Sequence, residues 1–103
     1  MACLIGMYTD FAFNRTYDLL DTRWKPYIVY TVGSDVYRFG DLKRIFHSIS
    51  RVTLTKYLHE LERDGFIKKK EYPAPPLKTE YSLTELGLSV YPIIESLISW
   101  GEQ

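Results

Sequence analysis

Residues 49–65, with the sequence ISRVTLTKYLHELERDG, constrain the fold most, because they carry the start, the buried face and the end of one helix. Ser50 is a suitable N-cap, since its hydroxyl accepts a hydrogen bond from an amide of the first turn. Apolar side chains then recur at helical spacing: Val52, Leu54, Tyr57, Leu58 and Leu61. Gly65 readily adopts the left-handed conformation that ends a helix. The segment therefore predicts a short, capped and amphipathic helix.

The other face of this predicted helix is positively charged near its start. Arg51, Thr53, Thr55 and Lys56 precede Glu60, the first acidic residue of the segment. Cationic and hydroxyl side chains of this kind bind phosphates and base edges in nucleic acids. Taken alone, the same residues also suit the solvated face of an ordinary core helix. The neighbouring segments must therefore decide between the two interpretations.

A second short helix is expected immediately upstream. Residues 37–39 suit a brief strand, and residues 40–46 suit a helix. An apolar stripe runs along this segment: Phe39, Leu42, Ile45 and Phe46. His47-Ser48 makes a tight turn before the next helix. Two short helices joined by a turn of about four residues form a helix-turn-helix, which we expect over residues 39–64.

After Gly65 the pattern changes to that of a β-hairpin. Residues 66–72 and 78–83 suit strands, and the proline-rich residues 73–76 suit the loop between them, because proline cannot continue a hydrogen-bonded ladder. Four lysines lie on this hairpin: Lys68, Lys69, Lys70 and Lys78. Lysine on an edge strand also prevents pairing with other strands, but beside a helix-turn-helix we favour phosphate contact. The hairpin over residues 66–83 is the expected wing.

The two ends of the chain are more apolar than one small core requires. Residues 84–103 predict a helix capped by Thr84, in which Pro92 marks a kink or a restart. Such a helix often buries its surplus apolar surface against a second subunit. We therefore expect a dimerisation helix at the C-terminus.

Upstream of the helix-turn-helix, the pattern is less decisive. Residues 14–20 and 24–32 suit short helices, whereas residues 1–12 suit either a helix that packs on a partner subunit or a partly ordered tail. In the second helix Ile28, Val29 and Val32 provide the buried face. We expect residues 1–13 to act as an N-terminal arm that takes part in dimerisation.

Composition and charge limit the class of protein. The 103 residues suit one domain with one core, and 46% hydrophobic with 25% charged residues is typical of a globular chain. The formal net charge is zero, but residues 38–70 hold nine basic and four acidic residues, while the rest holds four basic and nine acidic ones. This asymmetry allows a basic face for DNA despite the neutral total.

Little in the sequence indicates catalysis, a metal or a membrane. His47 and His59 stand apart from any cysteine or paired acid at metal-ligand spacing, and the sequence has no glycine-rich phosphate loop. Cys3 is the one cysteine, which excludes an internal disulfide and favours a reducing compartment. The N-terminus lacks the charged leader of a signal peptide, and no apolar run is long enough to span a bilayer. We expect a cytoplasmic protein without enzyme activity, cofactor or metal.

Together these segments predict a mainly α fold with a small β-hairpin (α+β): a winged helix-turn-helix in a single domain of residues 1–103. The sequence resembles the HxlR-type branch of winged-helix transcription regulators, which are relatives of the MarR group. The resemblance covers residues 14–100 and rests on an ordered set of motifs. These motifs are Asp18-Leu19-Leu20, Arg23-Trp24, Arg38-Phe39-Gly40-Asp41-Leu42, Ile49-Ser50, Leu54-Thr55, residues 58–65, Tyr72-Pro73, residues 80–87, Leu97 and Trp100-Gly101.

The resemblance implies a homodimer that binds a palindromic operator in double-stranded DNA. The helix of residues 50–63 would enter the major groove, the hairpin would flank it, and the terminal helices would form the dimer interface. Tyr57 stands where the family commonly has arginine, so we expect one DNA contact to be lost or replaced. Family members often carry an oxidant-sensing cysteine where this chain has Asp10-Phe11-Ala12, and Cys3, a few residues earlier, is the candidate redox sensor.

We therefore expect a sequence-specific transcriptional regulator that contacts DNA through the helix-turn-helix and the wing. The expected contact residues are Arg38, Lys43, Ser50, Arg51, Thr53, Thr55, Lys56, Lys68, Lys69, Lys70 and Lys78. Arg51 is the best candidate for bidentate recognition of guanine. The alternative is a winged helix that binds another protein, since a fold alone does not determine function. A small aromatic or apolar effector is a further hypothesis, with a site near the dimer interface lined by Tyr8, Phe11, Phe13, Tyr17 and Tyr91.

Overall fold

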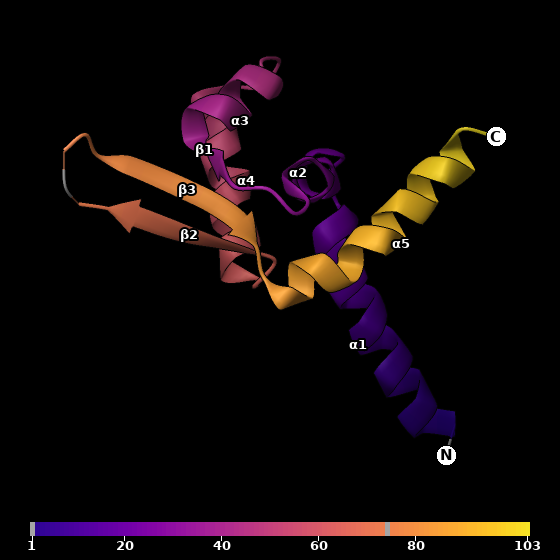
Figure 1. Cartoon of the computed structure of the whole chain (residues 1–103). Coiled ribbons are helices and arrows are strands. Elements are labelled where there is room, and N and C mark those ends of the chain that lie inside the picture. The colour runs from indigo at the N-terminus through magenta and orange to yellow at the C-terminus, as the bar shows by residue number, and fades with distance from the viewer. Residues whose placement is uncertain (1, 74) are drawn as a thin grey trace.

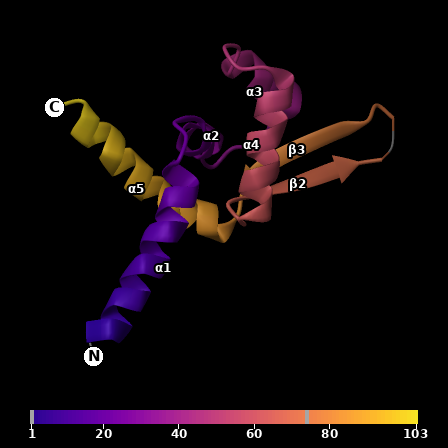
Figure 2. The same ribbon diagram turned by 180° about the vertical axis from the view of Figure 1, so that it is seen from behind.

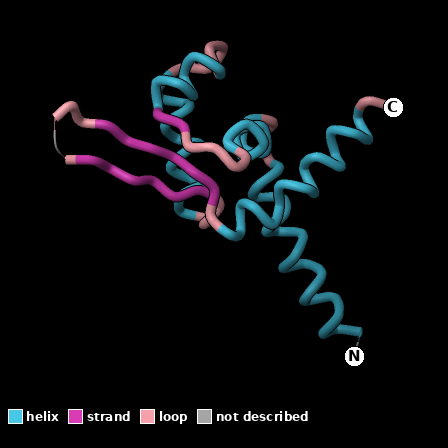
Figure 3. Tube along the Cα trace, viewed as in Figure 1, coloured by secondary structure: helices cyan, strands magenta, loops and turns pink. Residues whose placement is uncertain are grey.

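The computed structural model describes the backbone of residues 2–73 and 75–103, and the side chains of residues 10–73 and 75–103. Its elements are α1 (Ala2–Leu20), α2 (Trp24–Val32), β1 (Tyr37–Arg38), α3 (Phe39–Ile45), α4 (Arg51–Arg63), β2 (Ile67–Tyr72), β3 (Lys78–Leu83) and α5 (Glu85–Gly101). The β2–β3 hairpin points one way, and α1 and α5 diverge toward the opposite end (Figures 1 and 3). This arrangement confirms the predicted winged helix-turn-helix.

Helix α4 begins and ends where its sequence signals predict. Ser50 is its N-cap. At the other end Gly65 has a φ of 86°, its amide donates to Glu62 O, and the amide of Phe66 donates to Leu61 O. These two bonds form a Schellman motif, which satisfies carbonyls that a helix end would otherwise leave free. Seen from behind, α4 lies against the base of the hairpin, which extends beyond it (Figure 2).

Helix α2 occupies the centre of one hydrophobic core. Ile28, Val29 and Val32 have no exposed surface, as their spacing predicts. The core also contains Leu19, Leu42, Phe46, Leu54, Leu58, Leu61, Phe66, Ile67, Tyr81, Leu83 and Ile94. Burial of a side chain of this size contributes about 1.5–3 kcal/mol. The core therefore fixes the helix-turn-helix and the base of the wing to the same helix.

The turn between α3 and α4 is anchored by one aromatic side chain. Phe46 is 2% exposed and lies edge-on to Tyr27 and Trp24, with ring centroids 5.0 Å and 6.1 Å away. Edge-to-face contact places the positive edge of one ring on the negative face of another. The start of α4 is thereby held against α2.

The sheet has the strand order β1–β3–β2, with both pairs antiparallel, so β2 is an edge strand. Ile67 pairs with Leu83 and Lys69 with Tyr81. Paired residues point to the same side of a sheet, and Ile67, Leu83 and Tyr81 are buried. Lys69 therefore lies on the core side, whereas its neighbours Lys68 and Lys70 lie on the solvent side.

The start of α5 is fastened to the end of α4. Thr84 caps α5 by accepting a hydrogen bond from Gly87 N over 3.1 Å, and its hydroxyl donates to Gly65 O. Gly87 is buried, and a Cβ there would overlap Phe66 O and lie 3.2 Å from the Leu83 side chain. Glycine at this position permits the close packing of α5 on the hairpin.

Several details of the sequence prediction are wrong. Of the two alternatives for residues 1–12, the structure has the helix, which is continuous with residues 14–20 as α1, and α5 runs through Pro92 without a restart. Val52, which the spacing placed beside the buried face, is 79% exposed, and Ile45 is 43% exposed. The apolar character of these two residues does not distinguish them from their buried neighbours, because only one side of a helix packs against the core. The ends of α3 and β2 differ from the prediction by one residue.

Candidate nucleic-acid interface

The N-terminus of α4 is an exposed and positively charged helix start. Ser50 Oγ accepts a hydrogen bond from Thr53 N over 3.1 Å and donates one to Thr53 Oγ1 over 3.0 Å. The first turn of α4 has no acidic residue. The amides of Arg51 and Val52 precede the capped one, so they point out of the helix start, where the helix dipole favours an anion.

One stripe of α4 faces away from the core. Its members are separated by three or four positions, so they lie on one side of the helix: Val52, Thr55, Lys56, His59 and Arg63. All five are exposed. Sequence reasoning proposed Thr55 and Lys56 as contact residues but missed Val52. An exposed valine in this place offers an apolar contact of the kind that thymine methyl groups accept.

Arg51 is held at the junction of the two helices of the motif. Its guanidinium lies over the Phe39 ring, 5.4 Å from the centroid. Such a cation–π contact limits the freedom of the side chain while leaving the nitrogen donors at its edge accessible. In the part of the chain that the structure describes, Arg51 makes no ion pair with an acid. It is therefore free to bind an external acceptor.

Two other cations lie near the first helix of the motif. Arg38 is exposed, and its backbone amide donates to a carboxylate oxygen of Asp41 over 3.2 Å. Arg44 pairs with the other carboxylate oxygen of Asp41. Lys43 is half-buried and forms no ion pair with a described residue. Arg38 and Lys43 are thus available cations, whereas the charge of Arg44 is compensated.

The wing carries an ordered pair of lysines close to its tip. Lys70 and Lys78 lie over the Tyr72 ring, with their Nζ atoms 5.1 Å and 4.4 Å from its centroid. Lys78 also comes within 3.9 Å of Glu80. Because the ring restrains both side chains, less conformational entropy is lost when they bind an anion.

Lys69 differs from the other wing lysines in its surroundings. Its Nζ lies 3.0 Å from a carboxylate oxygen of Glu71. The hydrogen bond to Glu71, followed by the charge interaction with Tyr81, raises the pKa of Lys69. Burial raises the pKa of the Tyr81 hydroxyl beside it. Lys69 is therefore charged but already partnered, and Lys68 and Lys70 are the better placed cations of β2.

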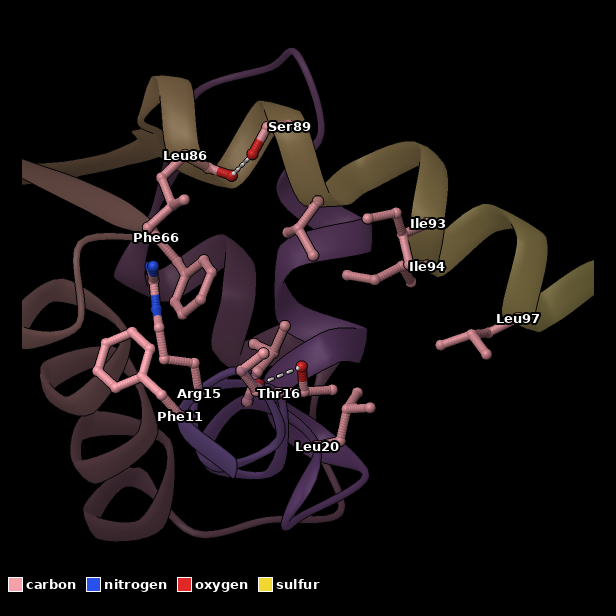
Figure 4. Close-up of a pocket in the computed structure, with 13 residues that line it drawn as sticks. Phe11, Arg15, Thr16, Leu20, Phe66, Leu86, Ser89, Ile93, Ile94 and Leu97 are labelled. Carbon is pink, nitrogen blue, oxygen red and sulfur yellow. Dashed lines mark hydrogen bonds between the residues drawn. The ribbon is translucent and has the colours of Figure 1, made fainter. Parts of the chain in front are cut away.

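An apolar groove lies between α1 and α5 (Figure 4). It has a volume of about 370 Å³ and is lined by residues that include Phe11, Leu20, Ile93 and Leu97. Arg15 is the one charged residue among those that line it. The sides of the groove, Ile93 at 58% and Phe11 at 65%, remain largely exposed.

Of the five predicted effector residues, the structure describes the side chains of Phe11, Phe13, Tyr17 and Tyr91, and it does not bring these four into one pocket. Phe11 lines the α1–α5 groove, but Phe13 and Tyr17 do not. Tyr91 stacks on Tyr30 of α2 instead, with 5.4 Å between ring centroids. The side chain of Tyr8, like that of Cys3, lies outside the described residues.

No three histidine, cysteine, aspartate or glutamate side chains of the described residues are grouped as a metal site requires. Among the described helices, none has the length and apolarity needed to cross a bilayer.

A capped helix-turn-helix, followed by a basic hairpin and flanked by apolar terminal helices, defines the class of winged-helix transcription regulators. The model of the HxlR-like helix-turn-helix family matches residues 19–103. The chain belongs to this family.

Individual relatives agree with this assignment. The HTH-type transcriptional regulator BH0655 of Halalkalibacterium halodurans is 44% identical over 93 residues, which are 89% of this chain and 82% of that protein. The redox regulator HypR in its reduced form superposes with a TM-score of 0.82 and 37% identity, over 88% of this chain and 90% of HypR. A Porphyromonas gingivalis W83 structure described as a MarR-family regulator has a TM-score of 0.82, 35% identity, and coverage of 88% and 89%.

Proposed function

We propose that the protein regulates transcription as a homodimer that binds a palindromic operator, with α4 in the major groove and the β2–β3 hairpin on the flanking backbone or minor groove. The exposed, acid-free start of α4, with Arg51 held over Phe39, carries the proposal. Recognition helices contact bases with the residues near their N-termini.

The contact residues of the proposal divide by role. Arg51, Val52, Thr55 and Lys56 are proposed to contact base edges, since they lie on the exposed first turns of α4. The remaining residues are proposed to bind phosphates and fix the register: Arg38, Lys43, Ser50, Thr53, Lys68, Lys69, Lys70 and Lys78. Substitution of a residue that contacts bases should change the sequence preference, whereas substitution of a residue that binds phosphate should not.

The exposed apolar surface of the terminal helices supports the homodimer. On α1 it includes Phe13 and Tyr17, both 69% exposed, and on α5 it includes Ile93 and Trp100, at 58% and 74%. Soluble monomers rarely expose contiguous apolar patches of this kind. The radius of gyration is 15.6 Å, larger than the roughly 13 Å of a compact chain of this length.

Binding to a library of double-stranded DNA, measured by fluorescence anisotropy at several salt concentrations, tests the proposed function. We expect enrichment of a sequence with dyad symmetry and an affinity that falls steeply with salt, because cations bound to phosphates displace counterions. Weak binding without sequence preference at every salt concentration would contradict the proposal and favour the alternative of a winged helix that binds a protein.

A further inference from the structure

Lys25 is a buried charged residue on α2. Its residue is 3% exposed, the one charged or polar residue in the buried set of the described chain. Lysine is almost never fully buried unless it is paired, because an unpaired ammonium in the interior loses its hydration. Lys25 lies in the first turn of α2, the helix at the centre of the core. Its partners therefore indicate which elements its charge connects to α2.

The partners of Lys25 come from two different elements. Its Nζ donates a hydrogen bond to Asp18 O over 3.2 Å, at the C-terminal end of α1, and lies 3.7 Å from Asp21 just beyond that helix. On the other side it lies 3.6 Å from Glu60 Oε1, in the third turn of α4. One side chain therefore bridges the end of α1 and the third turn of α4, the helix with the exposed basic face.

The bond to Asp18 has a clear physical basis. The last four carbonyls of a helix lack partners within the helix, and the negative end of the helix dipole attracts a cation. Lys25 satisfies one of these carbonyls and places its positive charge at the end of α1. The position of α1 is thus coupled to the position of the Lys25 ammonium.

A contribution to the stability of the fold does not readily explain why Lys25 is paired with Glu60. Glu60 Oε2 is buried and has no hydrogen-bond partner among the described residues. A buried ion pair with such an incomplete set of bonds often stabilises a fold less than apolar residues of similar size would. In some proteins, however, buried charges select one arrangement of the elements that they join, because other arrangements leave the charges unpaired.

We propose that Lys25 is a positioning residue that sets the angle between α1 and α4, and thereby the distance and rotation between the two recognition helices of the dimer. This inference rests on the proposed function, in which α1 contributes to the dimer interface and α4 enters the groove. Glu60 is one turn beyond Lys56 on α4, so a tilt of α4 about Glu60 would displace the base-contacting turns.

Half-site spacing provides the test, because it separates geometry from stability. Each base pair inserted between half-sites moves one of them by about 3.4 Å and rotates it by about 34° around the DNA axis. A dimer with a rigid angle between α1 and α4 discriminates strongly between spacings. A dimer with a loose angle tolerates several spacings with similar affinity.

The experiment measures the dissociation constant of the full chain for operators that differ only in this spacing. Three variants are compared with the wild type. The double variant Lys25→Met/Glu60→Met removes both charges. Glu60→Gln removes one charge but keeps the size of the side chain, and Lys25→Arg keeps the positive charge. Glu62→Gln is the matched control, since it removes an acid from α4 that has no ion pair in the described structure. Thermal melts establish that each variant is folded.

We expect the ratio of affinities between the best spacing and its neighbours to fall by about threefold or more in the double variant, the range found when one member of a coupling network is removed. Glu60→Gln should lower the ratio as well. Lys25→Arg, which keeps the charge, should lower it less than the double variant does, and Glu62→Gln should leave it unchanged. Base preference within a half-site should be preserved in all variants.

A ratio that stays at the wild-type value, with affinity lowered equally at every spacing, would show that Lys25 serves stability alone and overturn the inference. If the double variant does not fold, Glu60→Gln decides the question by the same ratio. The proposed function fails in a different way, namely when the wild-type chain itself binds no dyad at any spacing.

Discussion

At the scale of single residues, the start of α4 shows which functional side chains a sequence reveals. Arg51 and Ser50 are recognisable because charge and capping preference depend on local sequence. Val52 is not, because valine suits both the core and a contact surface, and only its 79% exposure decides. Lys25 is harder still, since its proposed role depends on Asp18 and Glu60, which lie in other helices.

Substitution of Arg51 by alanine should weaken binding to the operator by about 1–3 kcal/mol and relax the preference for one base pair. The physical reason is the loss of a bidentate contact to a base edge. Competition binding with operators altered at single positions measures both effects. Lys70→Ala is the matched control, expected to weaken binding to all sequences alike, and an unchanged base preference in Arg51→Ala would contradict the assigned roles.

Substitution of Gly87 by alanine should destabilise the fold by about 1–3 kcal/mol, the usual cost of an overpacked site. The added Cβ would overlap Phe66 O, a backbone atom that cannot rotate away. Chemical denaturation measures the change. Gly101→Ala is the control, because a Cβ there meets no atom within 4 Å. Equal stability of the two variants would show that α5 packs differently on the hairpin.

At the scale of elements, the sequence predicts most of what is observed. Signals local to one helix, such as caps, stripes and the proline-rich loop, correctly located α2, α4, β3 and α5 and nearly located α3 and β2. For residues 1–12 the sequence left a helix and a partly ordered tail as alternatives, because the apolar residues there have only weak periodicity. Strand geometry alone requires Lys68, Lys69 and Lys70 to point to alternate sides of the sheet, but the pairing of Lys69 with Glu71 depends on side-chain placement.

The wing lysines should contribute unequally to DNA binding. Lys68→Ala or Lys70→Ala should reduce the slope of log affinity against log salt by about 1, as expected for the loss of one phosphate contact. Lys69→Ala should reduce it less, because its ammonium is already paired with Glu71 at 3.0 Å. Salt titrations of each variant check the order. A larger effect for Lys69 than for Lys68 and Lys70 would mean that the core side of the wing faces DNA.

At the scale of the whole molecule, the wing and the terminal helices occupy opposite ends of an elongated chain with extents of 58 × 34 × 24 Å (Figure 1). The sequence predicted both apolar ends, since excess apolar residues are a matter of composition. It did not predict the groove between them, because α1 and α5 are far apart in the chain and meet only through the fold.

Introduction of a charge on the exposed apolar face of α5 should prevent dimerisation. Ile93→Asp, at the edge of the α1–α5 groove, would place an unpaired carboxylate in the proposed interface. Analytical ultracentrifugation should detect a monomer, and binding to the dyad should be lost. Val36→Asp is the control, since Val36 is 59% exposed but lies between α2 and β1. If the Ile93→Asp variant were still a dimer, the dimer interface would have to lie elsewhere on the chain.

The length of α1 bears on how operator occupancy would depend on the concentration of the protein. Since much of α1 projects beyond the core of its own chain (Figure 1), the proposed partner subunit would supply apolar contacts that the single chain lacks. Folding and assembly would then be linked by mass action, so the melting temperature would rise with protein concentration. At concentrations well below the dissociation constant of the dimer, the active species would scale with the square of the chain concentration. A twofold change in synthesis would then change operator occupancy by more than twofold.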